Sequence, residues 1–305
     1  MTAPQGHHAQ RPAAAGAPAA GAPLSRSRLA ALTTLALIAF AGNSLLCRLA
    51  LKTTAIDPAT FTSVRIVAAA AMLWLIQHGR GGALRGGAGD WYAAFALIVY
   101  AAAFSFAYVG LPAGTGALLL FGAVQASMIG YALWSGERLH PRQWLGMMLA
   151  LAGLVGLVLP GVAAPAPLSS LLMLAAGIAW GAYSLRGKRA ADPAAATAGN
   201  FLRAVPFAAA LSVSMQAHLS VDRAGVIYAL VSGAITSGLG YVIWYAALKE
   251  LRASSAATVQ LSVPLIAALG GIALLNEPLT PRLVASATAI LGGIAVVIVG
   301  KAKAA

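Results

Sequence analysis

The feature that most constrains this chain is a succession of ten apolar stretches. Each is about long enough to cross the hydrocarbon core of a bilayer as a helix, which takes about 20 residues. Only 9% of the residues are charged, whereas a soluble domain carries about 25%. We therefore expect an all-α integral membrane protein with ten transmembrane helices. The expected spans are roughly 29–50, 57–77, 91–110, 114–135, 141–159, 168–186, 193–217, 224–248, 253–275 and 281–300.

The first 28 residues differ from the rest because they are rich in Ala, Pro and Gly and have no apolar period. We expect residues 1–28 to form a disordered cytoplasmic tail and not a signal peptide. Four of the later spans are expected to begin at a proline that follows a capping residue. These pairs are Asp57-Pro58, His140-Pro141, Asp192-Pro193 and Thr280-Pro281.

The basic residues predict the orientation in the membrane, because cytoplasmic loops carry an excess of Lys and Arg. With a cytoplasmic N-terminus, four basic residues fall on the outside: Arg48, Lys52, Arg223 and Arg282. Arg65 and Arg203 lie within spans, and the remaining 14 of the 20 Lys and Arg fall on the inside. We expect both termini in the cytoplasm and a location in the cell inner membrane. The net charge of +13 is spread over many short loops, so no nucleic-acid partner is expected.

Two short segments indicate an internal duplication. "GERLHPRQWLG" (136–146) and "NEPLTPRLVAS" (276–286) share Glu, Leu, Pro and Arg at matching positions 140 residues apart. Each half then holds five spans, and because five is odd, the second half must enter the membrane inverted. We expect a first repeat at 29–159 and an inverted second repeat at 168–300. Glu137 and Glu277 are interpreted either as structural partners of the following helix dipole or as gating residues. In the structural interpretation, Arg142 and Arg282 pair with the glutamate or with lipid headgroups.

Two five-span halves that each carry "E-x-L-x-P-R" before a last Gly/Ala/Val/Leu helix resemble the EamA-type carriers of the drug/metabolite transporter superfamily. Within it, the general character is most similar to the YddG-type bacterial amino-acid exporters. The resemblance implies alternating access and a small-molecule solute such as an amino acid, in a monomer or weak homodimer within a lipid bilayer. The second half has the family's helix proline at Pro264, a candidate hinge, where the first half has Val124.

The ionisable residues within the spans are few. Every Asp, Glu and His falls in a loop, in the tail or at a helix end, so the device that usually couples transport to protons is missing. Arg65 and Arg203 remain. They lie roughly 12 and 15 Å from the expected starts of their spans, at about 1.5 Å per residue. An arginine near mid-bilayer costs at least about 2.5–3.5 kcal/mol. Each is interpreted as lining the substrate path or as a structural residue that snorkels or binds a carbonyl.

Aromatic and amide side chains supply the other candidates for a solute site. Tyr100, Phe104 and Tyr108 recur at helical spacing, and Trp180 lies deep in its span. The remaining candidates are Asn43, Gln125, Tyr183 and Tyr241. Packing between helices is the alternative interpretation, since buried amides must be satisfied whether or not a cavity is present. We expect spans 1 to 4 and 6 to 9 to line a central cavity, with 5 and 10 peripheral.

Other classes fit less well. An intramembrane enzyme needs paired acids, a Ser–His pair or a zinc motif within the spans, and a metal carrier needs clustered ligands, whereas only Cys47 is present. No cofactor is expected. A sugar-phosphate or nucleotide-sugar carrier that uses Arg65 and Arg203 is the main rival, and should show more basic residues in its cavity. A multidrug or metabolite exporter of the same superfamily is the other alternative.

Overall fold

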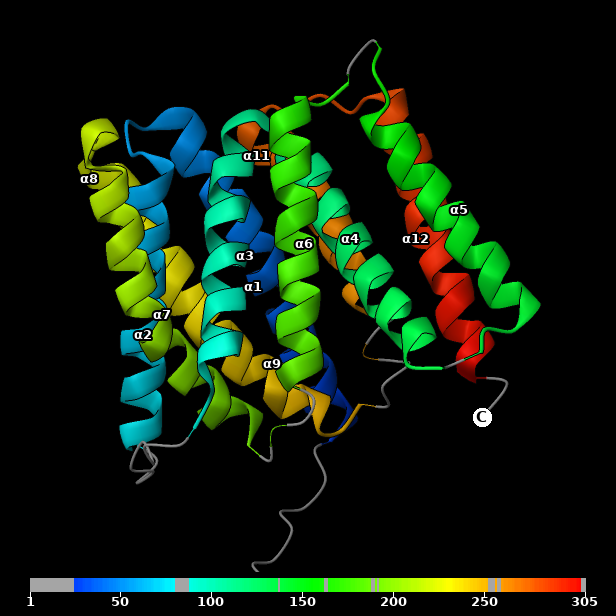
Figure 1. The fold of residues 1–305 in the computed structure, drawn as a ribbon, viewed down its shortest axis with the longest axis horizontal. Helices are drawn as coiled ribbons and strands as arrows, with labels where there is room; N and C mark the ends of the chain where they lie inside the picture. Colours follow the sequence, from blue (N-terminus) through cyan, green and yellow to red (C-terminus); the bar gives the residue numbers. More distant parts are fainter. Residues whose placement is uncertain are drawn as a thin grey trace, which may run out of the picture.

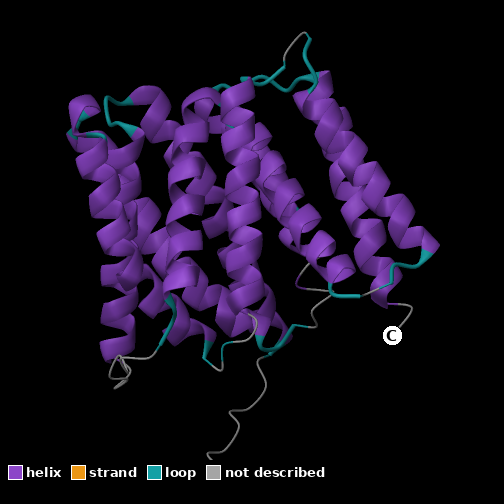
Figure 2. Ribbon diagram, viewed as in Figure 1, coloured by secondary structure: helices purple, strands orange, loops and turns teal. Residues whose placement is uncertain are grey.

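The computed structural model describes residues 25–79, 88–136, 138–161, 164–187, 190, 192–251, 256 and 259–302. Throughout these residues the regular secondary structure is helical, as Figures 1 and 2 show. Residues 1–24, Glu137, Lys188 and Arg189 lie outside the described part. The prediction of an all-α membrane protein is confirmed.

The helices follow one another through short connections. Their bounds are α1 (Arg26–Thr53), α2 (Pro58–Gly79), α3 (Trp91–Gly110), α4 (Ala113–Trp134), α5 (Pro141–Val158), α6 (Pro167–Gly187), α7 (Pro193–Ser214), η1 (Gln216–His218), α8 (Arg223–Val231), η2 (Ser232–Leu239), α9 (Gly240–Leu248), α11 (Ser262–Leu275) and α12 (Pro281–Ala302). The η1 segment is a 3₁₀ turn, and η2 is a π-helical segment between α8 and α9.

Among the described residues, eight stretches are long and apolar enough to cross a membrane, with Arg223–Leu248 counted as one. The α7 helix has 22 residues but is not among the eight, and its interior contains Asn200, Arg203 and Pro206. The α11 helix has only 14 residues in the described part. The number of ten spans therefore stays a prediction.

Helix α1 begins earlier than the sequence predicted. Its first residue is Arg26, inside the segment 1–28 that was expected to be disordered. The Ser25 hydroxyl caps this end by accepting a hydrogen bond from the Arg28 amide at 3.3 Å. Arg26 and Arg28 are exposed, so a helical turn here places their charges outside the apolar part of α1.

The four predicted helix starts are confirmed. The Asp57 carboxylate accepts hydrogen bonds from the amides of Ala59 and Thr60, both at 2.9 Å. His140 and Gln143 form a capping box on α5, Asp192 caps α7, and the Thr280 hydroxyl accepts from the Leu283 amide. Burial raises the pKa of Asp57, but hydrogen bonds from Thr60, Ser220 and Ala59 outweigh it and hold that pKa below its ordinary value.

Helix contacts in the first half have counterparts in the second half. The α3 helix packs on α6, and α8 with η2 packs on α1; α4 packs on α6, and α11 packs on α1. If α1 is exchanged with α6, α3 with the α8–α9 stretch and α4 with α11, each first contact of these two pairs becomes the second. Figure 1 shows α1 and α6 running in opposite directions, with the start of α1 and the end of α12 on one face of the bundle. This is the pattern that inverted repeats require, although the boundaries 29–159 and 168–300 stay predictions.

Helices α5 and α12 pair at one edge of the bundle (Figure 1). Glycines let their backbones touch, because a Cβ added at Gly293 would lie 2.4 Å from the Gly146 carbonyl oxygen and 2.6 Å from the Ala150 amide. A Cβ at Gly153 would lie 2.8 Å from that of Ala289. Small residues allow close helix contact in membranes. The close contact of α5 with α12 therefore depends on residues that have little or no side chain.

We expect Gly293→Leu to destabilise the protein by about 1–3 kcal/mol, the usual effect of overpacking a close contact. Its thermal unfolding midpoint in detergent should fall, while relative transport of different solutes stays unchanged. Gly292→Leu is the matched control, because a Cβ there meets nothing within 4 Å. A changed solute preference in Gly293→Leu at normal expression would contradict the peripheral role of α5 and α12.

Candidate functional site

A cavity of about 430 Å³ lies among the helices. Its lining comes mainly from α1, α3, α4, α6, η2 and α9, and no lining residue comes from α5 or α12. The prediction that span 2 also lines it is wrong, and α7 contributes only Pro193. Seven predicted site residues line the cavity: Asn43, Tyr100, Phe104, Gln125, Trp180, Tyr183 and Tyr241.

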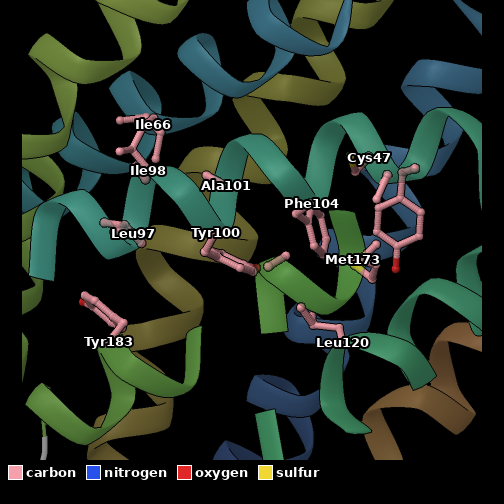
Figure 3. Close-up of a cluster of buried hydrophobic side chains, with 14 of the residues drawn as sticks. Cys47, Ile66, Leu97, Ile98, Tyr100, Ala101, Phe104, Leu120, Met173 and Tyr183 are labelled. Atoms are coloured by element: carbon pink, nitrogen blue, oxygen red, sulfur yellow. The ribbon is translucent and has the colours of Figure 1, made fainter. Parts of the chain in front are cut away.

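Aromatic rings form a continuous wall around Trp180. The Trp180 ring centroid lies 4.8 Å from that of Tyr100, 5.1 Å from that of Tyr183 and 5.5 Å from that of Tyr241. Phe104 continues the wall, 5.5 Å from Tyr100. Figure 3 shows Tyr100 and Phe104 projecting from α3 on the same side, with residues of α4 and α6 beyond them. This wall offers large apolar faces to a solute.

A polar patch interrupts the aromatic wall at Asn43. The Asn43 side-chain oxygen accepts hydrogen bonds from the hydroxyls of Ser232 at 2.7 Å and Thr236 at 3.4 Å, both in η2. Its amide nitrogen donates to the Tyr100 hydroxyl at 3.4 Å. The amide is thereby satisfied without water, as a buried amide must be. Asn43 joins α1, α3 and the π-helical segment at the cavity surface.

Arg65 lies behind this wall and not in the cavity lining. Its side chain is only 2% exposed, and its Nη2 atom donates a hydrogen bond to the Tyr100 hydroxyl at 3.2 Å. The guanidinium carbon is 5.4 Å from the Tyr100 ring centroid and 4.9 Å from that of Phe104. Such distances allow cation–π attraction, which is stronger away from water. Arg65 is therefore separated from the cavity by the rings that form its wall.

Arg203 and Tyr108 also lie away from the cavity. The Arg203 guanidinium donates to the carbonyl oxygens of Ala88 at 2.5 Å and Gly199 at 3.1 Å. The side chain extends toward the start of α7 and reaches Ala88, just before the start of α3. The charge therefore lies less deep than the position of Arg203 in its span suggested. Tyr108 is fully buried, and its hydroxyl donates to the Ala113 carbonyl at 3.3 Å. The structure gives both side chains structural partners.

The cavity extends to the face of the bundle that carries both chain ends. Gly187 and Leu248, at the ends of α6 and α9 on that face, belong to its lining. Near this end the Thr197 hydroxyl lies 3.3 Å from the hydroxyls of both Tyr183 and Tyr245.

The α3 start on this face is held by an exposed ion pair. Arg186 lies 3.2 Å from the Asp90 carboxylate, and its guanidinium also lies over the Tyr92 ring. Burial raises the pKa of Asp90, but hydrogen bonds from Ala93 and Arg186 and the Arg186 charge outweigh it, so the pKa lies below its ordinary value. Asp90 is therefore an anion near neutral pH and gives no proton-relay group at this end.

At the opposite end of the bundle, Glu277 connects several segments of the chain. This carboxylate is buried, lies 3.1 Å from Arg48 Nε, and accepts a hydrogen bond from the Ala113 amide at 2.7 Å. Arg48 also donates to the carbonyls of Tyr108 and Val109, both at 2.9 Å. One carboxylate thus ties α1, the start of α4 and the α11–α12 connection together.

The predicted partner of Glu277 was wrong. Arg282 donates instead to the carbonyls of Leu157 and Leu159 at the end of α5, so it holds α5 to α12. The equivalent acid, Glu137, lies outside the described residues. Pro264 is buried near the start of α11, and residues 259 and 260 just before this helix are also helical, so its role as a hinge stays a prediction.

Sequence reasoning missed several lining residues. Phe40 and Trp244 line the cavity, with ring centroids 5.8 Å apart, and so does Gln260. Phe40 precedes Asn43 by three residues and shares its helix face, which is the signal that could have found it. Thr236 of η2 also lines the cavity.

The comparisons with known proteins agree with this architecture. The model of the EamA-like transporter family matches residues 167–299. An uncharacterised protein of Pseudomonas aeruginosa is 55% identical over 267 residues, covering 88% of this chain and 93% of the relative. A crystal structure with 20% identity superposes with a TM-score of 0.65 over 90% of this chain and 98% of that one, which shows a shared fold.

Two more distant relatives carry functional names. An "uncharacterized transporter" of Archaeoglobus fulgidus is 25% identical, covering 81% of this chain and 89% of that protein. A "probable amino-acid metabolite efflux pump" of Salmonella typhimurium is 26% identical, covering 63% of this chain and 69% of the pump.

The family model and the transporter-named relatives, together with the helical bundle, define the class as a membrane transporter. The chain belongs to the EamA-like transporter family, within the drug/metabolite transporter superfamily that the sequence resembles.

We expect Trp180→Ala to reduce transport at least about tenfold without loss of folded protein, because stacking and apolar contact with one large ring are together worth about 1.5 kcal/mol or more. Initial uptake rates in proteoliposomes, corrected for protein content, measure this. Trp134→Ala is the matched control, since Trp134 is 86% exposed on the outer surface. A fully active Trp180→Ala variant would return Trp180 to a packing role.

Proposed function

We propose that the protein is an inner-membrane exporter of small organic solutes, with amino acids, including apolar and aromatic ones, as its substrates. The observation that carries the proposal is the cavity of about 430 Å³, walled by aromatic rings and marked by one amide-centred polar patch. Its volume and lining suit a solute with an apolar side chain and a small polar head. The name of the Salmonella typhimurium relative supports the same substrate class.

Such a cavity would accept several side chains. An apolar wall distinguishes solutes weakly, because one methylene changes binding by only about 1–3 kcal/mol. Phe104 and Trp180 offer ring faces without a charged group to select a particular side chain. We therefore propose a broad specificity among apolar and aromatic amino acids.

Alternating access would move the solute across. In our proposal ten spans form two inverted repeats, both termini are cytoplasmic, and the halves rock about the cavity. The cavity reaches the face of the chain ends at Gly187 and Leu248, whereas Arg48 and Glu277 hold the other end together. The described conformation then corresponds to a state open to the cytoplasm.

No buried acid would couple this cycle to protons. Among the residues that the structure describes, the aspartates cap helix starts and Glu250 follows α9. Glu277 is engaged by Arg48 and the Ala113 amide. We propose movement of a zwitterionic solute down its own gradient without obligatory proton exchange.

A sugar-phosphate or nucleotide-sugar carrier is supported less well. Such a solute carries two or more negative charges, and its site needs several cations. The described lining of the cavity includes no Lys, Arg or His, and Arg203 is bound to backbone carbonyls elsewhere. A multidrug or metabolite exporter with broader specificity would also use an apolar wall, and the uptake test described next distinguishes it from an amino-acid exporter.

The test is uptake into proteoliposomes with a panel of amino acids, sugar phosphates and quaternary amines. We expect phenylalanine and leucine to equilibrate without an imposed pH difference and without changing the lumenal pH. Empty liposomes and a cavity-filling Val124→Trp variant are the controls, because Val124 lines the cavity. Uptake of sugar phosphates or quaternary amines alone would overturn the substrate class, and solute accumulation driven by a proton gradient alone would overturn the driving force.

A further inference from the structure

The Arg65 guanidinium is an uncompensated charge in the interior of the bundle. Its Nε and Nη1 atoms are buried without a hydrogen-bond partner, and only Nη2 is engaged, by the Tyr100 hydroxyl. Within the described part of the chain, the buried acid Glu277 is already paired with Arg48. A buried charge that lacks an anionic partner is costly, and a ligand anion is one way to complete it.

Tyr100 connects this charge to the cavity. Its hydroxyl accepts two hydrogen bonds, from Arg65 Nη2 at 3.2 Å and from Asn43 Nδ2 at 3.4 Å. A phenol oxygen has two lone pairs and one proton, so its own O–H remains free to donate. Neither neighbouring group can accept that proton, and Tyr100 itself lines the cavity. A cation that donates to the oxygen polarises the O–H and makes it a stronger donor.

We propose that Tyr100, Asn43 and Arg65 form a subsite for the single carboxylate of the transported solute. The Tyr100 hydroxyl donates to the carboxylate, and Arg65 supplies the opposing charge from behind the aromatic wall. This inference rests on the proposed function and names the feature of the solute that the site recognises. One cation and one free donor suit a monoanion, whereas a phosphate dianion would need more of both.

The subsite also fixes how the solute lies. With its carboxylate at the Tyr100 hydroxyl, the rest of the solute extends along the wall toward Trp180, whose ring centroid is 4.8 Å from that of Tyr100. The Asn43 oxygen that completes the patch is held by Ser232 at 2.7 Å. Because Ser232 opens the π-helical segment η2, a change in that segment would alter the subsite directly, and π-helical turns are frequent at functional sites.

The test measures binding to the purified full chain by intrinsic tryptophan fluorescence. The probes are phenylalanine, phenylalaninamide, which lacks the carboxylate, hydrocinnamate, which lacks the amine, and phenethylamine, which lacks the carboxylate. We expect the two carboxylates to bind at least about tenfold more tightly than the other two, as a charge-assisted hydrogen bond predicts. Arg65→Gln and Tyr100→Phe should each remove that preference and leave phenylalaninamide binding within about twofold of its starting value.

Two variants provide matched controls for the lost charge and the lost hydroxyl. Arg223→Gln removes an exposed charge at the start of α8, and Tyr228→Phe removes a hydroxyl outside the cavity lining, so both should keep the preference. If Arg65→Gln fails to fold, Tyr100→Phe decides, because its ring and packing remain.

The outcomes separate this proposal from the proposed function. A carboxylate preference that survives in Tyr100→Phe and Arg65→Gln would overturn the subsite while amino-acid binding stands. Binding of hydrocinnamate but not phenylalanine, with dependence on Arg65, would support the subsite and overturn the amino-acid assignment. Binding of none of the four probes would overturn both.

Discussion

The closed end of the bundle depends on one buried carboxylate. Glu277 brings together Arg48 from α1 and the Ala113 amide at the start of α4, although it is far from both in the sequence. Lys52 adds a hydrogen bond to the Leu275 carbonyl at 2.7 Å, so the end of α1 is held to the end of α11. A charge-assisted bond of this kind contributes about 1.5–3 kcal/mol when intact, and leaving one partner buried alone costs more. A free energy in that range shifts the populations of two conformations about tenfold or more, and it is small enough for the binding of a solute to reverse the shift.

Around the cavity, two physical requirements oppose each other. A solute path needs polar groups, whereas the membrane requires every polar group to be satisfied. The structure meets both by sharing partners: the Asn43 amide takes two hydroxyls from η2 and donates to Tyr100, and Tyr100 also accepts from Arg65. The aromatic wall keeps the Arg65 guanidinium out of direct contact with the cavity without neutralising its charge. Helices α5 and α12 remain apart from this chemistry and pack through glycines at the edge of the bundle.

Sequence patterns predict the parts of this account that depend on local chemistry. The length of the apolar stretches predicted the helices, and Asp, His or Thr before a proline predicted where four of them begin. Both signals depend only on residues that are neighbours in the sequence. Long-range pairing was beyond reach: Glu277 binds Arg48 across 229 residues, where proximity along the chain suggested Arg282. Depth was also misleading for Arg203, since its long side chain reaches the Ala88 carbonyl before the start of α3. The cavity residues were found where polarity was unusual for a membrane span, as at Asn43, and missed where an ordinary Phe40 faces inward.

We propose that the ion pair between Arg48 and Glu277 keeps the cavity closed at the end opposite the start of α1. Phe121→Cys in a Cys47→Ala background would place a single thiol in the cavity. A membrane-impermeant thiol reagent should label it from the side of the termini only, and Glu277→Gln should add labelling from the opposite side. The exposed Glu250→Gln is the matched control and should add none. Equal labelling from both sides with Glu277 intact, or no change in Glu277→Gln, would contradict the account.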